Sequence, residues 1–180
     1  MELRILTEEQ GKTVWETDLH RDFPESELKS WDLTCGLIRS GVYEMLDFWE
    51  NGVRVGYAWM LVPEGDAVLL DYLAVLPPCR GSGVGGEILR QLRARYGSCG
   101  KRLLLESEYP EEAPDPAMAR RRLGFYARSG MVNSGVQVRL LGVRFWILAD
   151  GENPDAARQM ERLYRVLFPG AEYEDAVQFL

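Results

Sequence analysis

The sequence predicts an α/β fold with a mixed, mostly antiparallel sheet of about seven strands flanked by helices. Aromatic and β-branched runs on both sides of the Asn51–Gly52 turn predict one antiparallel hairpin, and similar runs around Gly142 predict another. One parallel pair is also expected, because an apolar strand over 67–76 leads through a glycine-rich loop and a helix over about 83–96 to a buried strand over 101–107. This crossover should be right-handed.

The N-terminal segment is expected to form a short strand and two helical stretches before the first hairpin. The run "ELRILTE" alternates enough for a strand, and helical spacing follows over 8–31. Pro24 interrupts that spacing, so a new helix should begin after it, with Ser26 as a weak N-cap.

Three signals place the later elements. A turn at 63–66 precedes the long apolar strand. The run "PAMARRRLGFYARSG" predicts a helix with Pro116 in its first turn and Gly130 past its end. A final helix is expected over 154–168, with Asn153 as its N-cap and proline at its first position.

Composition narrows the class of protein. The length suits a single domain over 1–180. A net charge of −7 argues against a nucleic-acid partner, which needs a basic surface, and mildly favours a cationic substrate such as an amine. No apolar run is long enough for a membrane span, and no secretory signal is evident, so we expect a cytoplasmic protein. Cys35, Cys79 and Cys99 fit no metal spacing, and no metal site is expected.

The glycine-rich loop is open to three interpretations. Its pattern Gly81-x-Gly83-x-x-Gly86, with Glu106 about 20 residues on, matches the dinucleotide-binding fingerprint. Against this, residues 77–80 separate the loop from its strand, whereas a dinucleotide fold turns directly off the strand. A plain turn before a helix is the second interpretation, but the loop holds more glycine and serine than a turn requires.

The third interpretation is an anion site for a diphosphate. Glycines leave the backbone N–H groups unobstructed, and those of the first helical turn have no partner within the helix. The helix dipole favours negative charge at the same place. Arg80 would add a cation at the rim that can hold phosphate oxygens in pairs.

Two sequence blocks resemble a known family. "RGSGVG" over 80–85 is similar to the Arg/Gln-x-x-Gly-x-Gly/Ala acetyl-CoA loop of the GNAT superfamily of N-acetyltransferases. "RRRLGFYARSGM" over 120–131 resembles the later helix of that family, which commonly ends in Phe-Tyr-x-x-x-Gly-Phe. The blocks come in the family's order with a strand between them, and the detailed resemblance covers about 69–131.

The resemblance implies a GNAT-like domain whose fourth and fifth strands splay apart to admit acetyl-CoA as co-substrate. The cofactor-binding core would span about 67–131, with the pyrophosphate on the loop and the pantetheine beside the fourth strand. A backbone N–H of that strand would polarise the thioester carbonyl. The cofactor-binding residues implied are Leu73, Ala74, Val75, Arg80, Gly81, Ser82, Gly83, Val84, Gly85 and Gly86.

The same resemblance suggests catalytic residues. Tyr126 matches the family tyrosine that protonates the departing thiolate, although its helical spacing also fits a core aromatic. Glu106, at the end of an apolar strand, is the candidate base for the incoming ammonium, with Glu108 as an alternative on the same face. Either could also be a plain strand-end carboxylate. Asp71 is a weaker candidate that would contact substrate or pair with an arginine.

Other residues depart from the family pattern or carry no assigned role. Ala119 stands where many members have a pantetheine-binding Asn, so no contact is assigned to it, and Met131 replaces a common Phe. One arginine of 120–122 would reach the CoA phosphates, but such runs are usually a solvated face. Cys79 has no adjacent base and His20 is remote, so both are expected to be structural or surface residues.

The function expected from this resemblance is acetyl transfer from acetyl-CoA to a primary amine of a small molecule or peptide, by direct attack in a ternary complex. The acceptor pocket would be built from roughly 18–35 and 133–146. The alternatives are a non-catalytic acyl-CoA sensor or scaffold of the same fold, and a dinucleotide-binding oxidoreductase. The protein is expected to be a monomer or homodimer.

Overall fold

The computed structural model describes residues 1–180, apart from the side chain of Ser26. Its strands form one mixed sheet in the order β1-β2-β3-β4-β5-β7-β6-β8. The strands are β1 (Glu2–Ile5), β2 (Tyr43–Glu50), β3 (Val53–Leu61), β4 (Ala67–Val75), β5 (Arg102–Glu108), β6 (Val132–Leu140), β7 (Val143–Ala149) and β8 (Val177–Phe179). The predicted α/β fold with a mixed sheet is confirmed. The sheet has eight strands rather than about seven, because β8 pairs with β6 and was not predicted.

Helices connect these strands. They are α1 (Glu8–Val14), α2 (His20–Asp22), α3 (Trp31–Arg39), α4 (Val84–Gly97), α5 (Pro116–Arg128), α6 (Ala156–Leu167) and α7 (Glu172–Ala176). A π-helical turn, Trp15–Leu19, joins α1 to α2. The parallel pair is the predicted one, since β4 and β5 pair in parallel over 67–70 and 102–105 with α4 between them in sequence. The expected divergence of these two strands stays a prediction. None of the described helices combines the length and apolar character needed to cross a membrane.

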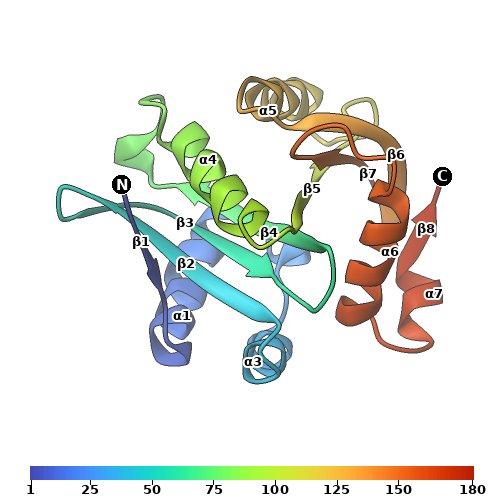
Figure 1. Ribbon diagram of the computed structural model, residues 1–180, viewed down its shortest axis with the longest axis horizontal. Coiled ribbons are helices and arrows are strands. Elements are labelled where there is room, and N and C mark those ends of the chain that lie inside the picture. Colours follow the sequence, from blue (N-terminus) through green and yellow to red (C-terminus); the bar gives the residue numbers. More distant parts are fainter. The chain divides into compact units, whose positions relative to one another are not determined.

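The chain forms two compact units (Figure 1). The first comprises Met1–Glu64 and Asp71–Ile88, and the second comprises Gly65–Leu70 and Leu89–Leu180. Both β4 and α4 contribute residues to each unit. Each unit has its own core of fully buried side chains, which include Phe48, Tyr57, Trp59 and Ile88 in the first and Leu103, Leu104, Ile147 and Tyr164 in the second.

The first unit is built on the predicted hairpin. Asn51 and Gly52 have φ angles of 50° and 78°, so both occupy the left-handed region that a tight hairpin turn requires. β1 pairs with the outer edge of β2, while α1 and α3 lie close to each other and α3 packs on β2. The N-terminal strand is present, and helices lie both before and after Pro24.

The boundary between the helical stretches differs from the expectation. Residues 25–27 form a short 3₁₀ turn, and α3 begins only at Trp31. Its N-cap is Ser30, whose Oγ accepts a hydrogen bond from the N–H of Leu33 at 3.3 Å. The side chain of Ser26, the expected cap, lies outside the part that the structure describes.

The second unit contains the other predicted hairpin, β6–β7, which turns through Leu141 and Gly142 with φ angles of 48° and 87°. β7 also pairs antiparallel with β5. Helix α5 starts as predicted, with Pro116 at its first position. Its N-cap is Asp115, which accepts a hydrogen bond from the N–H of Met118 at 2.9 Å.

The start of the last long helix was predicted wrongly. α6 begins at Ala156 with Asp155 as its N-cap, not at 154 with Asn153. The Oδ1 of Asn153 instead accepts a bond from the N–H of Asp155 at 3.2 Å, which turns the chain before the helix begins. Its Nδ2 donates to Oε1 of Gln159 at 2.8 Å. The red C-terminal segment in Figure 1 shows α6, α7 and β8 close to β6.

Candidate active site

The glycine-rich loop lies in the first unit and leads into α4. Gly81 and Gly83 have φ angles of 77° and 88°, a region that side chains other than glycine rarely adopt. The N–H of Glu87 donates to the carbonyl of Gly83 at 3.1 Å, which closes the first turn of the helix. The N–H groups of Val84, Gly85 and Gly86 lie in the first turn of the helix, where the helix offers no carbonyl acceptor. The loop therefore presents backbone donors at a helix N-terminus, where an anion is stabilised.

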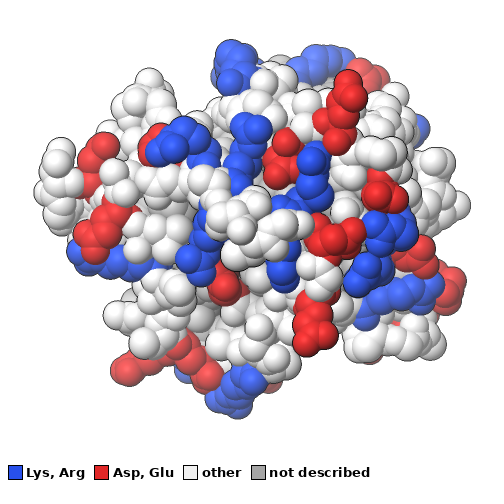
Figure 2. All heavy atoms as spheres, viewed as in Figure 1, with Lys and Arg blue, Asp and Glu red and all other residues white. Residues whose placement is uncertain are grey.

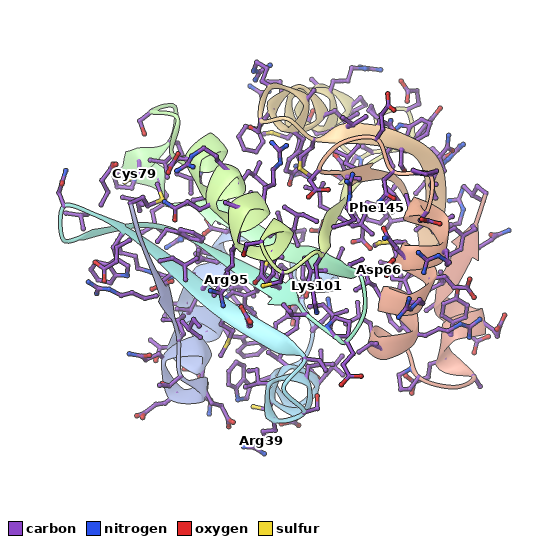
Figure 3. All side chains as sticks on the ribbon, viewed as in Figure 1. Arg39, Asp66, Cys79, Arg95, Lys101 and Phe145 are labelled. Carbon is purple, nitrogen blue, oxygen red and sulfur yellow. The ribbon has the colours of Figure 1, made fainter. Side chains whose placement is uncertain are left out.

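The side chain of Arg80 fastens the loop to its surroundings. Its Nε donates to the carbonyl of Val75, the last residue of β4, at 2.9 Å, and its Nη2 bonds the carboxylate of Asp22 at 3.1 Å. Ser82 donates to the carbonyl of Cys79 at 2.6 Å, so the 3₁₀ turn that holds Cys79 is tied to the loop (Figure 3). The Arg80 side chain is 57% exposed, so the guanidinium both holds the loop and lies at the surface where the sequence predicted a cation.

Asp22 is the buried anchor of this arrangement. Its carboxylate also accepts hydrogen bonds from Arg21 at 2.6 Å and from the hydroxyl of Tyr57 at 3.0 Å. Burial alone would raise the pKa of Asp22, but these donors outweigh it and the pKa is lowered overall. Burial, with the nearby Asp22 charge, raises the pKa of Tyr57. The carboxylate is therefore ionised and the phenol neutral at neutral pH.

The strand before the loop has the alternation that a half-buried strand requires. Leu73 and Val75 are half-buried, and Ala74 between them is buried. The N–H of Leu76 donates to the carbonyl of Val55 in β3 at 2.9 Å. The stretch 73–75, expected to bind pantetheine, is thus an ordered strand that ends directly before the loop's 3₁₀ turn.

Asp71, earlier on β4, has a lysine partner rather than an arginine. The Nζ of Lys29 lies 2.7 Å from Oδ1 of Asp71, and the hydroxyl of Tyr43 donates to Oδ2. The Asp71 side chain is only 6% exposed. Burial, followed by the charge of Asp71, raises the pKa of Tyr43 well above its ordinary value. This residue therefore belongs to a buried ion pair that ties the segment before α3 to β4.

Glu106 and Glu108 lie in the second unit, two positions apart at the end of β5. Glu106 is half-buried and accepts a hydrogen bond from the hydroxyl of Tyr164 on α6, with 2.5 Å between the oxygens. Glu108 is bonded by Arg122 of α5 at 2.9 Å. The carboxylates of Glu106 and Glu108 are therefore held by different helices, α6 and α5.

Tyr126 is buried on α5, and its hydroxyl makes no hydrogen bond to the part of the chain that the structure describes. The hydroxyls of the buried Tyr43, Tyr57 and Tyr164 each bond a carboxylate, whereas that of Tyr173, also buried, resembles that of Tyr126 in having no described hydrogen bond. Burial raises the pKa of Tyr126 above its ordinary value of 10.0, although the charge of Arg122 opposes this. The phenol therefore keeps its proton at neutral pH.

Comparison with known proteins decides the family. The model of the acetyltransferase (GNAT) family matches residues 5–125, about two-thirds of the chain. The chain belongs to this family.

Similar proteins agree with this membership. A Bacillus subtilis (strain 168) protein named as an acetyltransferase, YjbC, is 28% identical over 150 residues, which are 83% of this chain and 69% of YjbC. A solved structure of a GNAT-family protein from Bacteroides thetaiotaomicron superposes with a TM-score of 0.78 at 18% identity, and covers 94% of this chain and 99% of that chain. The structure of yncA from Salmonella typhimurium with acetyl-CoA gives 0.58 at 18% identity, over 85% and 95% of the two chains. These two likenesses show the fold.

Two residues that depart from the GNAT pattern, Ala119 and Met131, are buried in this structure. Ala119 is fully buried on α5, so the site of the common pantetheine-binding Asn is filled by a small apolar side chain. Met131 is 3% exposed, which fits an apolar replacement for Phe. The basic run is largely paired, because Arg120 contacts Glu111 at 3.4 Å and Arg122 bonds a carboxylate of β5.

The sequence predicts that Cys79 and His20 are structural or surface residues with no part in catalysis. Cys79 is a free, half-buried thiol on the 3₁₀ turn before the loop. His20 is exposed and packs edge-on against the ring of Trp15, with 4.5 Å between ring centroids. No described contact gives either residue a catalytic partner.

Asp22 and Tyr164 were not predicted from the sequence, although each bonds a predicted site residue. Asp22 holds Arg80 across 58 positions, and Tyr164 holds Glu106 across the same sequence distance. For Tyr164 a signal existed, because Met160, Leu163 and Tyr164 share the apolar face of α6 and a buried tyrosine hydroxyl needs a polar partner. Which carboxylate it bonds depends on the tertiary fold.

Proposed function

We propose that this GNAT protein is an N-acetyltransferase that binds acetyl-CoA as co-substrate and moves the acetyl group to a primary amine of a small molecule or peptide. Family membership supports acetyl transfer. The observation that carries the proposal is the loop in which Gly81 and Gly83 take left-handed φ angles and lead into the first turn of α4. The diphosphate of acetyl-CoA would be held by the backbone N–H groups of 81–86.

Each further role is argued from a residue's surroundings in its own unit. Leu73, Ala74 and Val75 would pair with pantetheine through their backbone, and one N–H would stabilise the oxyanion of the thioester carbonyl. Glu106 would take a proton from the incoming ammonium, directly or through water, which frees the nitrogen lone pair for attack.

Tyr126 would return a proton to the departing thiolate. Its protonated phenol and the absence of a described hydrogen-bond partner for its hydroxyl suit that role. Glu106 takes one proton from the ammonium, and the neutral amine then forms its bond to the acetyl carbon. The carbon–sulfur bond breaks, the thiolate takes the proton of Tyr126, and the second proton lost by the nitrogen replaces it through solvent. The products are an N-acetyl amide and free coenzyme A.

The acceptor is proposed to be cationic before it reacts. The sequence has a net charge of −7, which attracts ammonium groups over a distance. The expected acceptor segments contain aromatic side chains, such as the half-buried Phe145 and Trp146 of β7. The same proposal includes a single domain over 1–180, a cytoplasmic setting, and a monomeric or homodimeric state. These three points depend on composition alone.

The experiment is a release assay for coenzyme A thiol. The protein is incubated with acetyl-CoA and a panel of aminoglycosides, polyamines, amino acids and peptides with free N-termini, and new thiol is measured. Turnover with at least one amine, with the acetylated product seen by mass spectrometry, is expected. Tight acetyl-CoA binding with no turnover on any amine would favour the acyl-CoA sensor and contradict the transferase proposal.

A further inference from the structure

The side chain of Tyr164 makes an unusually close contact with the proposed base. Tyr164 is fully buried on α6, and its hydroxyl oxygen lies 2.5 Å from Oε1 of Glu106. Such a distance is typical of a hydroxyl that donates to an ionised carboxylate, where the bond is roughly twice as strong as one between neutral groups. Neither the GNAT motifs nor the family match, which ends at residue 125, includes this tyrosine.

The ring of Tyr164 is fixed from several sides. Met160, Leu163 and Leu167 of the same helix face are buried with it, and the ring of Phe179 in β8 lies 6.3 Å away between centroids. A hydroxyl on a ring held in this way has little freedom to follow a moving carboxylate. The carboxylate must therefore adopt the position that the hydroxyl sets.

The helix itself is fastened to the second unit by ionic contacts. Asp66, in the turn before β4, bonds Arg158 at 2.8 Å and Gln159 at 3.0 Å, and lies 3.4 Å from Arg162 (Figure 3). These contacts lie along the first half of α6. Together with the buried apolar face, they fix α6 and hence the tyrosine hydroxyl.

We propose that Tyr164 is a positioning residue for acetyl transfer, which holds Oε1 of Glu106 and keeps that carboxylate ionised and oriented to accept the acceptor's proton. The inference depends on the proposed function, in which Glu106 is the base. Tyr164 itself touches neither substrate nor cofactor in this scheme. A hydrogen-bond donor stabilises an ionised carboxylate, so the bond from Tyr164 lowers the pH at which Glu106 becomes available as the base.

The groups beside Glu106 on the sheet are a second carboxylate and an apolar side chain. On its own strand the neighbouring titratable group is Glu108, which is already bonded by Arg122 from α5. The strand β7 places Ile147 opposite Glu106. A hydrogen bond to its carboxylate comes from α6, through Tyr164.

The test is Tyr164→Phe, which removes only the hydroxyl. We expect kcat at its plateau to fall about tenfold, and the acidic limb of the kcat/KM profile to move up by roughly one pH unit, because the base loses a donor to its ionised form. The KM for acetyl-CoA should change little. A purely structural role would lower activity without moving the acidic limb.

Two controls separate the hydrogen bond from general damage. Tyr173→Phe removes another tyrosine hydroxyl from the C-terminal segment. The guanidinium carbon of Arg165 lies 4.0 Å from the centroid of the Tyr173 ring. This variant should leave the pH profile unchanged. Tyr164→Phe placed in a Glu106→Gln background should cause no further loss, because the tyrosine acts through the carboxylate. An additive loss in the double variant would overturn the proposal.

A second substitution keeps the test decisive if Tyr164→Phe is poorly folded. 3-Fluorotyrosine at position 164 preserves the ring and makes the hydroxyl a stronger donor, so the acidic limb should move to lower pH. An unmoved limb would overturn the positioning role while leaving the transferase function in place. If the wild-type protein acetylates no amine, the proposed function itself fails, and this inference fails with it.

Discussion

At the scale of single residues, the hydroxyl of Tyr126 has the properties that a proton donor needs. It is buried, makes no hydrogen bond to the described part of the chain, and has a pKa raised by burial. The hydroxyl of Tyr164, by comparison, is held by a carboxylate and is not available as a donor to a ligand. The free hydroxyl and the retained proton are therefore the two observations behind the proposed acid role.

Tyr126→Phe should therefore lower kcat by roughly 10²- to 10⁴-fold and leave the affinity for acetyl-CoA nearly unchanged. The acid is active while protonated, and its pKa lies above the ordinary 10.0, so the wild-type rate should not fall on this residue's account below about pH 10. Steady-state kinetics from pH 6 to 10 check both points. A variant with full kcat throughout would exclude the acid role.

At the scale of elements, the close approach of β3, β4 and α4 depends on a glycine. A Cβ at Gly56 would lie 2.7 Å from the carbonyl oxygen of Ala74 and 2.9 Å from Cδ1 of Ile88. Because the carbonyl belongs to a paired strand, it cannot move aside cheaply. The glycine is therefore required by packing rather than by a turn.

Gly56→Ala should destabilise the protein by about 1–3 kcal/mol, measured by urea unfolding. Gly36→Ala is the matched control, because it lies exposed on α3 with no atom within 4 Å of the added Cβ. The control should stabilise by about 0.5–1 kcal/mol, since alanine loses less entropy in a helix. Equal effects at both positions would contradict this account of the packing.

The fastening of α6 predicts a dependence of stability on pH. The hydrogen bond from Arg158, and then that from Gln159, lower the pKa of Asp66 from 3.8 to about 2. A lowered pKa means that the stabilisation is present above about pH 4 and is lost as the pH falls toward 2. The side chain is 44% exposed, so solvent screening keeps the contribution below about 1 kcal/mol.

Asp66→Asn should accordingly lower the free energy of unfolding by a few tenths to about 1 kcal/mol at pH 7. At pH 2 the difference from wild type should shrink, because the wild-type carboxylate is then partly protonated. Urea titrations at the two pH values measure it. A difference of the same size at both would show that charge is not the cause.

Most elements could be predicted because their signals are local. Asn51–Gly52 specifies its hairpin through two left-handed residues, and Asp115 with Pro116 specifies the start of α5. The start of α6 was misplaced because Asn153 serves equally well to cap a helix or to close a turn, and its bonds to Asp155 and Gln159 select the turn. The short strand β8 forms by pairing with β6, and its three residues are too few to predict a strand.

The candidate site was predictable in part for the same reason. The glycine loop and the block around Tyr126 are contiguous motifs, so the sequence displays them. The side-chain partners of Arg80, Asp71 and Glu106 come from segments 28 to 58 positions away, and only the fold brings them together. Asp71 illustrates the limit, because its expected arginine is in fact Lys29.

At the scale of the whole molecule, charge and family membership point to the same chemistry. On the face shown in Figure 2, lysine and arginine side chains have aspartate and glutamate side chains among them. The net charge of −7 weighs against binding to a phosphate backbone, and the amine acceptor is the proposal made above. The family match ends at residue 125, so Tyr126 and Tyr164 lie in the part that it leaves undefined.

The most direct measurement is the change in melting temperature with acetyl-CoA, with NADH as the competing ligand. A ligand at about 100 times its Kd stabilises the fold by ~2.7 kcal/mol, which raises the Tm of a protein of this size by several degrees. We predict such a rise with acetyl-CoA, none with NADH, and a smaller rise in Gly83→Ala, whose φ of 88° disfavours alanine. No shift with acetyl-CoA, or a shift with NADH alone, would contradict the loop as a seat for coenzyme A.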